Sequence, residues 1–370
     1  MSAGSAPIRR APQSRTSVIE VLRAGALTTV QDQGRPGYAH LGVPRSGALD
    51  PAALRLANRL VGNPATAAGL EITLTGCALR FTRAVTVALT GAEADVRIER
   101  PPARATALAA PTDPAPPTAG RPVERPPTAG RTVERRPGDG GERLREAAAQ
   151  VERRPGNGDE LLRWAAGQVE RRFGDVGRPL SLPAGAVLRV GPARAGLRTW
   201  LAVAGGIAVE PVLGSRATDT LSGLGPPPLR DGDRLPLGPA VGPPAPVDLT
   251  VTPPVPAELR LPLRLGPRHD WFGDTALDLL LRTAYAISPL SNRVGARLVG
   301  AALPRAVAGE LPSEGLVLGA VQVPPDGQPL IFLADHPTTG GYPVVGVVDD
   351  VTPLAQARPG TTVTFHGPQR

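Results

Sequence analysis

The sequence predicts a mainly β protein with a few helices, arranged as two β-barrel halves. Short β-like runs alternate with Gly/Pro turns along most of the chain. With 370 residues, the chain is longer than one typical domain and is expected to hold two cores. Aromatic residues make up only 3%, so these cores depend on Val, Leu, Ile and Ala. The pattern fits two closed or nearly closed barrels.

Residues 16–245 are assigned to the first half. Strands are expected over 17–22, 27–31, 70–74, 79–82 and 85–89, and again over 186–190 and 199–203. One helix is clearly signalled, with Asp50 as its N-cap and Pro51 at its first position. Apolar residues then follow at helical spacing, and the helix is expected to end near Gly62.

The composition changes between residues 100 and 176. Residues 116–125 are repeated almost identically at 126–135, and a second repeat relates 136–153 to 154–171. These repeats are too short and too polar to build a solenoid core. We interpret the segment as a low-complexity insertion with two short helices at most. An arm that docks a partner is the alternative.

Residues 246–368 are assigned to the second half, after a Pro-rich boundary at 239–257. A strand is expected over 259–265 and a helix over 274–284, and apolar runs follow at 316–321, 330–334 and 344–348. Residues 1–15 are polar and read as a disordered leader without a signal core. No apolar run approaches the roughly 20 residues of a membrane span. We therefore expect a cytoplasmic protein that does not contact the membrane.

Charge and composition argue against several classes of function. The net charge is +8, but the basic residues are all Arg, and many lie beside Glu in the 100–176 segment, so no nucleic-acid partner is expected. Without Lys there is no Walker A phosphate loop and no Schiff base. The single cysteine, Cys77, and four scattered histidines predict no metal site.

Polar motifs between the apolar runs of the second half predict a functional site. They are Ser-Glu-Gly (313–315), Gln-Val-Pro (322–324) and Thr-Thr-Gly-Gly-Tyr-Pro (338–343). Packed strands do not require such residues, whereas loops at strand ends commonly carry them in rigid sites. Glu314 and Asp335 are the candidate general acid/base pair. Arg293 and Arg297 are the candidate anion holders, because Lys is absent.

The remaining candidates would bind substrate. Asn292 stands beside Arg293, and Gln322 begins the 322–324 motif. Tyr342 is expected to stack on substrate or donate a hydrogen bond. Thr338 and Thr339, with the Gly340–Gly341 backbone, suggest an oxyanion or phosphate nest.

Two charged residues of the first half also stand out. Arg35 would either clamp a carboxylate or phosphate, or pair with Asp32 to close its turn. Glu71 lies among apolar residues, so it is expected to meet an Arg or a substrate group.

These motifs resemble one family along most of the chain. The second-half motifs, with Ser-Asn-Arg-Val-Gly-Ala-Arg-Leu-Val-Gly (291–300), are similar to the second subunit of allophanate hydrolase. First-half segments 30–37, 42–50, 57–63, 70–76, 201–207 and 213–218 agree in the same order. The family is biotin-dependent carboxyltransferase-like and includes the C subunit of bacterial 5-oxoprolinase and the antagonist of the kinase inhibitor KipI. The resemblance implies two cyclophilin-like β-barrel halves.

The resemblance implies three functions. The first is the C subunit of an ATP-dependent 5-oxoprolinase, which opens 5-oxo-L-proline to L-glutamate. Its partners would be a B-type (KipI-like) and an A-type (LamB/YcsF-like) subunit, which share the ATP. The second is a carboxyltransferase acting on a urea-like amide, with biotin on a separate carrier. The third is a non-catalytic antagonist of a KipI-like inhibitor, which the replacement of the family's usual Gln by Pro337 favours. Both substrates present a planar amide, so the motifs do not separate the first two.

Overall fold

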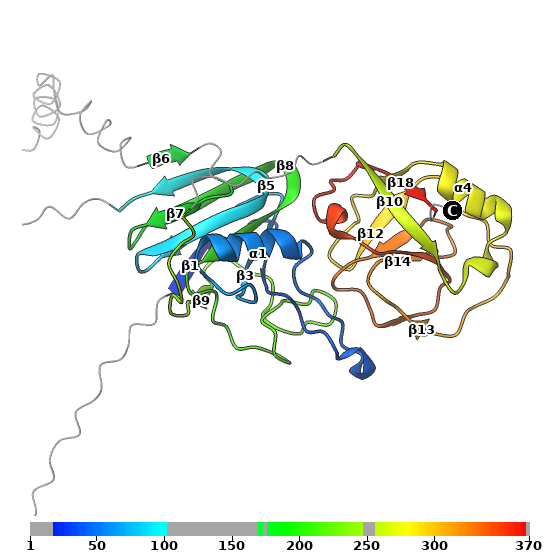
Figure 1. Cartoon of the computed structure of the whole chain (residues 1–370), viewed down its shortest axis with the longest axis horizontal. Helices are drawn as coiled ribbons and strands as arrows, with labels where there is room; N and C mark the ends of the chain where they lie inside the picture. The colour runs from blue at the N-terminus through cyan, green and yellow to red at the C-terminus, as the bar shows by residue number, and fades with distance from the viewer. Residues whose placement is uncertain (1–17, 102–168, 173–175, 247–255, 368–370) are drawn as a thin grey trace, which may run out of the picture. The chain divides into compact units, whose positions relative to one another are not determined.

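The computed structural model describes residues 18–101, 169–172, 176–246 and 256–367 (Figure 1). The mainly β prediction is confirmed, because a nine-stranded sheet forms the first half and a closed barrel forms the second. The expected leader and most of the expected insertion lie outside the described residues. None of the helices within the described ranges has the length and apolar character that a membrane crossing needs.

The first half is a curled sheet whose main path runs in the order β2-β3-β8-β4-β1-β9. Strand β5 pairs with β8 and also with β6 and β7. Val, Leu and Ile side chains from these strands fill one core. The strands are β1 (Val18–Arg23), β2 (Leu27–Gln31), β3 (Gly69–Thr73), β4 (Cys77–Phe81), β5 (Val85–Glu99), β6 (Val169–Arg172), β7 (Pro179–Leu182), β8 (Val187–Val203) and β9 (Arg234–Pro236).

Strand β8 differs from the prediction, which placed two separate strands at 186–190 and 199–203. The intervening Gly and Pro residues look like a turn, yet the strand continues through them. Its register against β5 shifts three times between Gly91 and Val96, so bulges accommodate the residues that read as turn formers. Strand β5 was predicted over 85–89 but extends to Glu99, because it pairs with β8 along this length.

The C-terminal boundary predicted for the insertion, residue 176, is also too late. Strand β6 lies within the predicted insertion and pairs with β5. Val176 forms a bridge with Leu89 and is buried in the first core. A repeat that looks dispensable in sequence therefore ends in residues that belong to the sheet.

Helix α1 (Pro51–Leu60) forms as predicted. The Asp50 side chain accepts a hydrogen bond from the Ala53 amide at 2.9 Å, which satisfies one of the free N–H groups of the first turn. Its apolar face packs on β5 and β8 through Ala88 and Ala202. This packing fixes the point where the preceding loop, residues 32–50, enters the helix.

The second half is a closed barrel in the order β10-β17-β14-β15-β12-β11-β18. Strand β10 closes it by pairing in parallel with β18 and antiparallel with β17. A separate ribbon joins β13 and β16. The elements are β10 (Glu258–Leu265), α4 (Asp274–Arg282), β11 (Tyr285–Ile287), β12 (Gly295–Val299), β13 (Glu314–Gly315), β14 (Ala320–Gln322), β15 (Leu330–Phe332), β16 (Thr339–Gly340), β17 (Val344–Val348) and β18 (Thr362–His366). Short 3-10 turns are η1 (Ala39–Leu41), η2 (His269–Trp271) and η3 (Thr352–Ala355).

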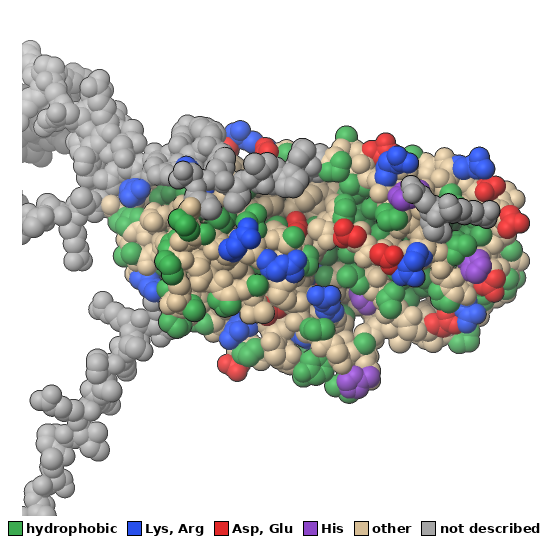
Figure 2. Space-filling model, in the orientation of Figure 1, with side chains coloured by type: hydrophobic (Ala, Val, Ile, Leu, Met, Phe, Trp, Pro, Cys, Tyr) green, Lys and Arg blue, Asp and Glu red, His purple; other side chains and the backbone are tan. Residues whose placement is uncertain are grey.

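The two halves share apolar packing as well as polar contacts. Leu49, from the loop before α1, is buried within the core of the second half. On the face shown in Figure 2, acidic and basic side chains are interspersed over both halves. The loop of residues 32–50 is thus anchored near its end by packing against both halves.

Candidate functional site

Arg293 is the centre of a buried polar contact between the halves. Its Nε and Nη2 atoms each donate to the Asp335 carboxylate at 2.9 Å, and Nη1 donates to Glu71 at 2.7 Å. Nη2 also donates to the Gly47 carbonyl at 2.7 Å. The side chains of Arg293, Glu71 and Asp335 are all 0% exposed. The guanidinium that sequence motifs suggested for substrate is therefore occupied by protein groups.

Both oxygens of the Asp335 carboxylate also have hydrogen-bond partners within the protein. Besides Arg293, it accepts hydrogen bonds from Ser46 Oγ at 2.7 Å and from the amide and hydroxyl of Thr220 at 3.0 and 2.7 Å. Burial alone would raise its pKa, but the Arg293 charge and these hydrogen bonds lower it below the ordinary value. A carboxylate held in this way does not donate a proton at neutral pH. The contacts give Asp335 a structural role in place of the predicted acid/base role.

Arg198 completes what we call the inter-half charge cluster: Glu71, Arg198, Arg293 and Asp335. Arg198 Nε lies 3.3 Å from a Glu71 oxygen, close enough for an ion pair, and Nη1 donates to the Ala355 carbonyl at 2.7 Å. Two positive and two negative charges are thus buried together. The expectation that Glu71 meets an Arg is confirmed.

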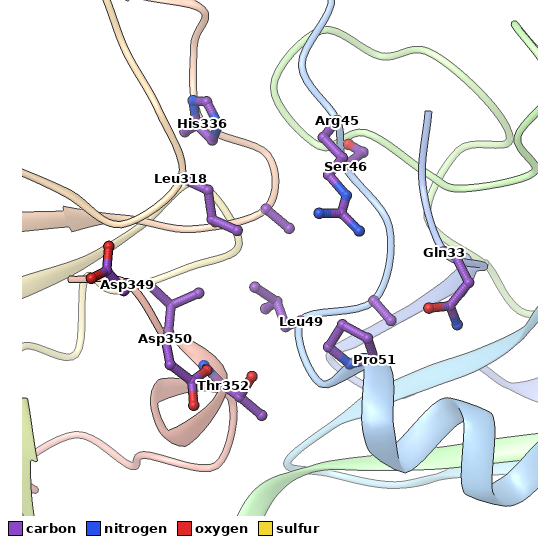
Figure 3. A pocket seen from close by; sticks show the side chains of 13 residues that line it. Gln33, Arg45, Ser46, Leu49, Pro51, Leu318, His336, Asp349, Asp350 and Thr352 are labelled. Atoms are coloured by element: carbon purple, nitrogen blue, oxygen red, sulfur yellow. The ribbon is translucent and has the colours of Figure 1, made fainter. Parts of the chain in front are cut away.

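A pocket of about 200 Å³ lies beside this cluster, between the two halves (Figure 3). The loop before α1 forms one wall, and loops from the second-half barrel form the other. The polar and charged residues that line it are Gln33, Arg45, Ser46, His336, Asp349, Asp350 and Thr352. Its lining combines residues from both halves, such as Gln33 and Asp350.

Ser46 fixes the first wall in an unusual backbone conformation. Its φ is 51°, a left-handed value that residues with a side chain rarely adopt. Its amide donates to the Ala334 carbonyl at 3.0 Å, and its hydroxyl donates to Asp335. A Cβ on the next residue, Gly47, would lie only 2.5 Å from the Gly34 nitrogen, so glycine is required there. Contacts from the second half therefore hold the turn that carries Arg45.

Arg45 contributes an exposed guanidinium to the pocket. Within the described part of the chain, no side chain or carbonyl pairs with it. Figure 3 shows its guanidinium extending from the first wall into the space between the two walls. Its backbone carbonyl accepts the Arg35 amide at 2.7 Å, so the main chain at this point is held in place.

His336 lies on the opposite wall. Its Nδ1 is 2.7 Å from the Pro337 carbonyl, which can only accept, so Nδ1 carries the hydrogen and Nε2 has a free lone pair. Burial lowers the pKa of the imidazole, although the Pro337 carbonyl, Asp335 and Asp219 oppose this shift. The ring is therefore neutral at neutral pH, and Nε2 can accept a proton.

The two aspartates of the pocket already have partners. Asp349 accepts three hydrogen bonds from Arg264, at 2.6 to 3.1 Å, and these bonds lower its pKa. Asp350 accepts the Thr352 amide at 2.9 Å. Both carboxylates add negative charge at this wall while serving structural contacts.

Glu314 lies apart from the pocket, on the β13–β16 ribbon. It forms a short ion pair with Arg268, whose hydrogen bond is the main reason that the Glu314 pKa is lowered. No hydrogen bond or ion pair joins Glu314 to Asp335 in the residues that the structure describes. The structure therefore does not bring the predicted acid/base pair together.

Gln322 and Tyr342 lie in the same region as this ribbon. Gln322 Nε2 donates to the Tyr342 carbonyl at 3.0 Å, and the Tyr342 side chain is 45% exposed. The guanidinium carbon of Arg305 lies 5.9 Å from the Tyr342 ring centroid, as in a cation–π contact. These groups form a surface feature outside the pocket lining.

The remaining second-half candidates are turn and strand residues. Asn292 Oδ1 accepts the Val294 amide at 2.8 Å and shapes the turn before β12. Arg297 is exposed on β12, so it shares no helical face with buried Arg293.

The predicted nest at 338–341 lies partly in strand β16 of the β13–β16 ribbon. The Thr338 carbonyl accepts the Leu316 amide at 2.8 Å, and Thr339 begins β16. Neither Gly340 nor Gly341 is among the described glycines with positive φ, the conformation that the αR-αL form of a nest uses.

Arg35 does not close its turn with Asp32. The Asp32 carboxylate accepts from the Gly34 amide, Ser215 Oγ and the Arg216 amide instead. Arg35 is 1% exposed and donates to the carbonyls of Val212 and Ala217. Its Nη1 has no hydrogen-bond partner among the described residues. It lies outside the pocket lining.

Sequence reasoning missed Arg45, Ser46 and His336 as site residues. Arg45 and Ser46 stand within segment 42–50, one of the segments that carry the family resemblance, and His336 stands just before the Thr-Thr-Gly-Gly motif. The sequence therefore pointed to both regions. Their meeting depends on a contact between positions 289 residues apart. No group of three or more His, Cys, Asp or Glu suited to a metal ion occurs in the described ranges.

A curled sheet and a closed barrel, joined by buried ion pairs beside a polar pocket, define a two-part β protein with a candidate small-molecule site. The family described as "Carboxyltransferase domain, subdomain A and B" matches residues 41–113 and 166–367, and the chain belongs to this family. The residues between the two matched segments, 114–165, lie within the predicted insertion.

Individual relatives agree with this assignment. The chain is 33% identical to the C subunit of 5-oxoprolinase from Escherichia coli over 94% of its own length and 90% of that protein. It is 26% identical to urea amidolyase of Saccharomyces cerevisiae, of which it covers 17%. The crystal structure of TTHA0988 matches with a TM-score of 0.69 and 30% identity, over 99% of this chain and 60% of that one. The Kluyveromyces lactis urea amidolyase structure, at 24% identity, supports the fold with a TM-score of 0.70 over 95% of this chain and 19% of that one.

Proposed function

We propose that this chain is the C-type subunit of an ATP-dependent 5-oxoprolinase, which opens 5-oxo-L-proline to L-glutamate. The observation that carries the proposal is the similarity to the C subunit of the E. coli enzyme, which extends over nearly the whole of both chains. The urea amidolyase relatives are also similar over most of this chain, but it covers less than a fifth of their length. The 5-oxoprolinase relatives therefore support a hydrolase subunit that acts within a complex.

The pocket between the halves is the proposed substrate site. Ring opening breaks the lactam C–N bond, adds water oxygen to the carbonyl carbon and leaves a proton on the departing nitrogen. Neutral His336 is placed to take a proton at Nε2. Ser46 positions the opposite wall through its contacts with Ala334 and Asp335.

The pocket is small for ATP. A volume of about 200 Å³ is below the ~300–1,000 Å³ of pockets that hold drug-sized ligands. Asp350 would also repel a triphosphate, whereas the charge of Asp349 is offset by Arg264. We therefore assign ATP, which drives the reaction, to surfaces shared with a B-type (KipI-like) and an A-type (LamB/YcsF-like) subunit. The complex would work in the cytoplasm, where ATP is supplied.

A carboxyltransferase acting on a urea-like amide is the second candidate, and the similarity to urea amidolyases favours it. The chain contains no Lys, so any biotin must be attached to another protein. In that case the pocket would hold a neutral amide and receive a carboxyl group from the carrier.

Reconstitution tests the proposal. The chain is co-expressed with B-type and A-type subunits, and glutamate release is followed with 5-oxo-L-proline and ATP present. We expect turnover only when all three subunits are present. Carboxylation of urea from a biotin carrier, without glutamate release, would support the second candidate instead. A stable complex with the B-type partner and no turnover of either substrate would support the non-catalytic antagonist.

A further inference from the structure

The charged groups of the pocket differ in how far they are already paired. Asp349 is bound by Arg264, and Asp350 accepts the Thr352 amide. Behind them, Asp335 is saturated by Arg293, Ser46 and Thr220. Arg45 is the exception, because its guanidinium has no partner among the described residues. An unpaired guanidinium in a cleft is a ready anion-binding group.

The backbone that carries Arg45 is held on both sides. The Arg45 carbonyl accepts from the Arg35 amide, and the next amide, of Ser46, donates to Ala334 in the other half. The left-handed conformation of Ser46 is maintained by these contacts. A side chain presented from a fixed turn loses less freedom on binding than one from a mobile loop.

The size and charge of the pocket define the anion. About 200 Å³ accommodates a small ring compound but not a nucleotide. Asp350 on the second wall disfavours a multiply charged phosphate, while the charge of Asp349 is offset by Arg264. A single carboxylate can lie against Arg45 on the first wall (Figure 3). A carboxylate also matches the planar fork of the guanidinium in a bidentate contact.

We propose that Arg45 binds the carboxylate of the substrate, so that the pocket selects an anionic lactam over a neutral, urea-like amide. This inference rests on the proposed function and adds the residue that decides between its two candidate substrates. A neutral amide leaves the guanidinium without a counter-charge, whereas 5-oxo-L-proline supplies one beside its lactam ring. Arg45 is thus a specificity-determining residue, on the wall opposite His336.

Binding and turnover are measured for the full chain and for the assembled complex. The probes are 5-oxo-L-proline, its neutral counterpart pyrrolidin-2-one, and inorganic phosphate. The variants are Arg45→Gln and Arg45→Lys, with Arg260→Gln as a matched control that removes an exposed Arg from β10. Because the Arg45 side chain forms no hydrogen bond or ion pair with the described residues, its variants should melt at the wild-type temperature.

We expect the wild-type chain to bind 5-oxo-L-proline at least about tenfold more tightly than pyrrolidin-2-one. Arg45→Gln should remove most of that preference without weakening pyrrolidin-2-one, and Arg45→Lys should restore it only in part. Equal preference in Arg45→Gln and wild type, or competition by phosphate at similar concentration, would overturn the inference. If the complex releases no glutamate while the carboxylate preference in binding holds, the proposed reaction fails and the assignment of Arg45 stands.

Discussion

The inter-half charge cluster and the adjacent pocket are both polar, but they differ in how completely their charges are paired. In the cluster, Arg293 is bound by two carboxylates and a carbonyl, and its side chain is inaccessible. In the pocket, Arg45 is exposed and unpaired within the described residues. Arg293, which the sequence motifs suggested as a substrate-binding residue, thus stabilises the contact between the halves. Arg45, which the motifs did not single out, is available to bind a ligand. A test of this comparison is to remove each group separately.

The largest effect is expected from Arg293→Met. The substitution leaves Glu71 and Asp335 buried with fewer partners, which should lower the free energy of unfolding by about 3–5 kcal/mol. Denaturant unfolding of the full chain measures the change. Arg297→Met, an exposed position four residues later, is the control and should change stability by no more than about 0.5 kcal/mol. Similar stability losses in the two variants would contradict the structural role of Arg293.

A smaller loss is expected from Asp335→Asn. The amide keeps the shape but places an N–H₂ group against donors from Arg293 or Thr220, at a cost of about 1.5–3 kcal/mol. Asp349→Asn, which breaks an exposed ion pair with Arg264, should cost less than Asp335→Asn, because exposed ion pairs contribute little to stability. The midpoints of urea unfolding for both variants provide the comparison. An equal cost at the two sites would mean that burial of Asp335 adds nothing.

The third effect is a dependence of stability on pH. The folded pKa of His336 lies below its ordinary value of 6.5, so the unfolded chain takes up this proton first as the pH falls. The His336 contribution is complete above about pH 6.5 and is lost as the pH falls through the folded pKa. Asp335 adds a second loss below about pH 3.8, since its folded pKa is also lowered.

Unfolding midpoints between pH 7.5 and pH 5 test the histidine contribution. His336→Asn should show a shallower decline over this range than the wild-type chain. Parallel declines for the two proteins would show that His336 titrates alike in the folded and unfolded states.

The smallest effect is expected from Glu314→Gln. The Glu314–Arg268 pair lies on the surface ribbon, so its loss should change the free energy of unfolding only slightly. Turnover of the assembled complex should fall by no more than about threefold, because Glu314 does not line the pocket. A decrease in turnover of tenfold or more would indicate that the β13–β16 ribbon is the reaction site.

The elements that follow from local chemistry could be predicted from the sequence. Asp50 and Pro51 marked the start of α1, and strands β2 and β17 have the predicted bounds. Strand β8 could not be predicted as one element, because its Gly and Pro residues break the local pattern and pairing with distant strands, mainly β5, keeps it extended. The return of β6 to the sheet was missed because its residues copy an earlier repeat.

The site was predicted only in part. Glu71 was expected to meet an Arg or a substrate group, but Arg293 was assigned to anion binding and Asp335 to acid/base chemistry. The sequence does not say that these three residues are one another's partners. That outcome depends on which loops the two halves bring together, and hydrophobic periodicity carries no such information. Arg45 and His336 were not predicted as site residues for the same reason. They lie on opposite walls of the pocket, and the pocket forms only when the two halves meet.

The central claim is that Arg293 stabilises the fold whereas Arg45 binds the ligand. The most direct test is the melting temperature of Arg45→Gln and Arg293→Lys with and without 5-oxo-L-proline. A ligand that binds the folded state raises the melting temperature, so one experiment reports both stability and binding. We predict that Arg293→Lys melts lower but keeps the ligand-induced rise, whereas Arg45→Gln melts as wild type and loses it. The opposite pattern, with binding lost at unchanged stability in Arg293→Lys and retained in Arg45→Gln, would contradict the account.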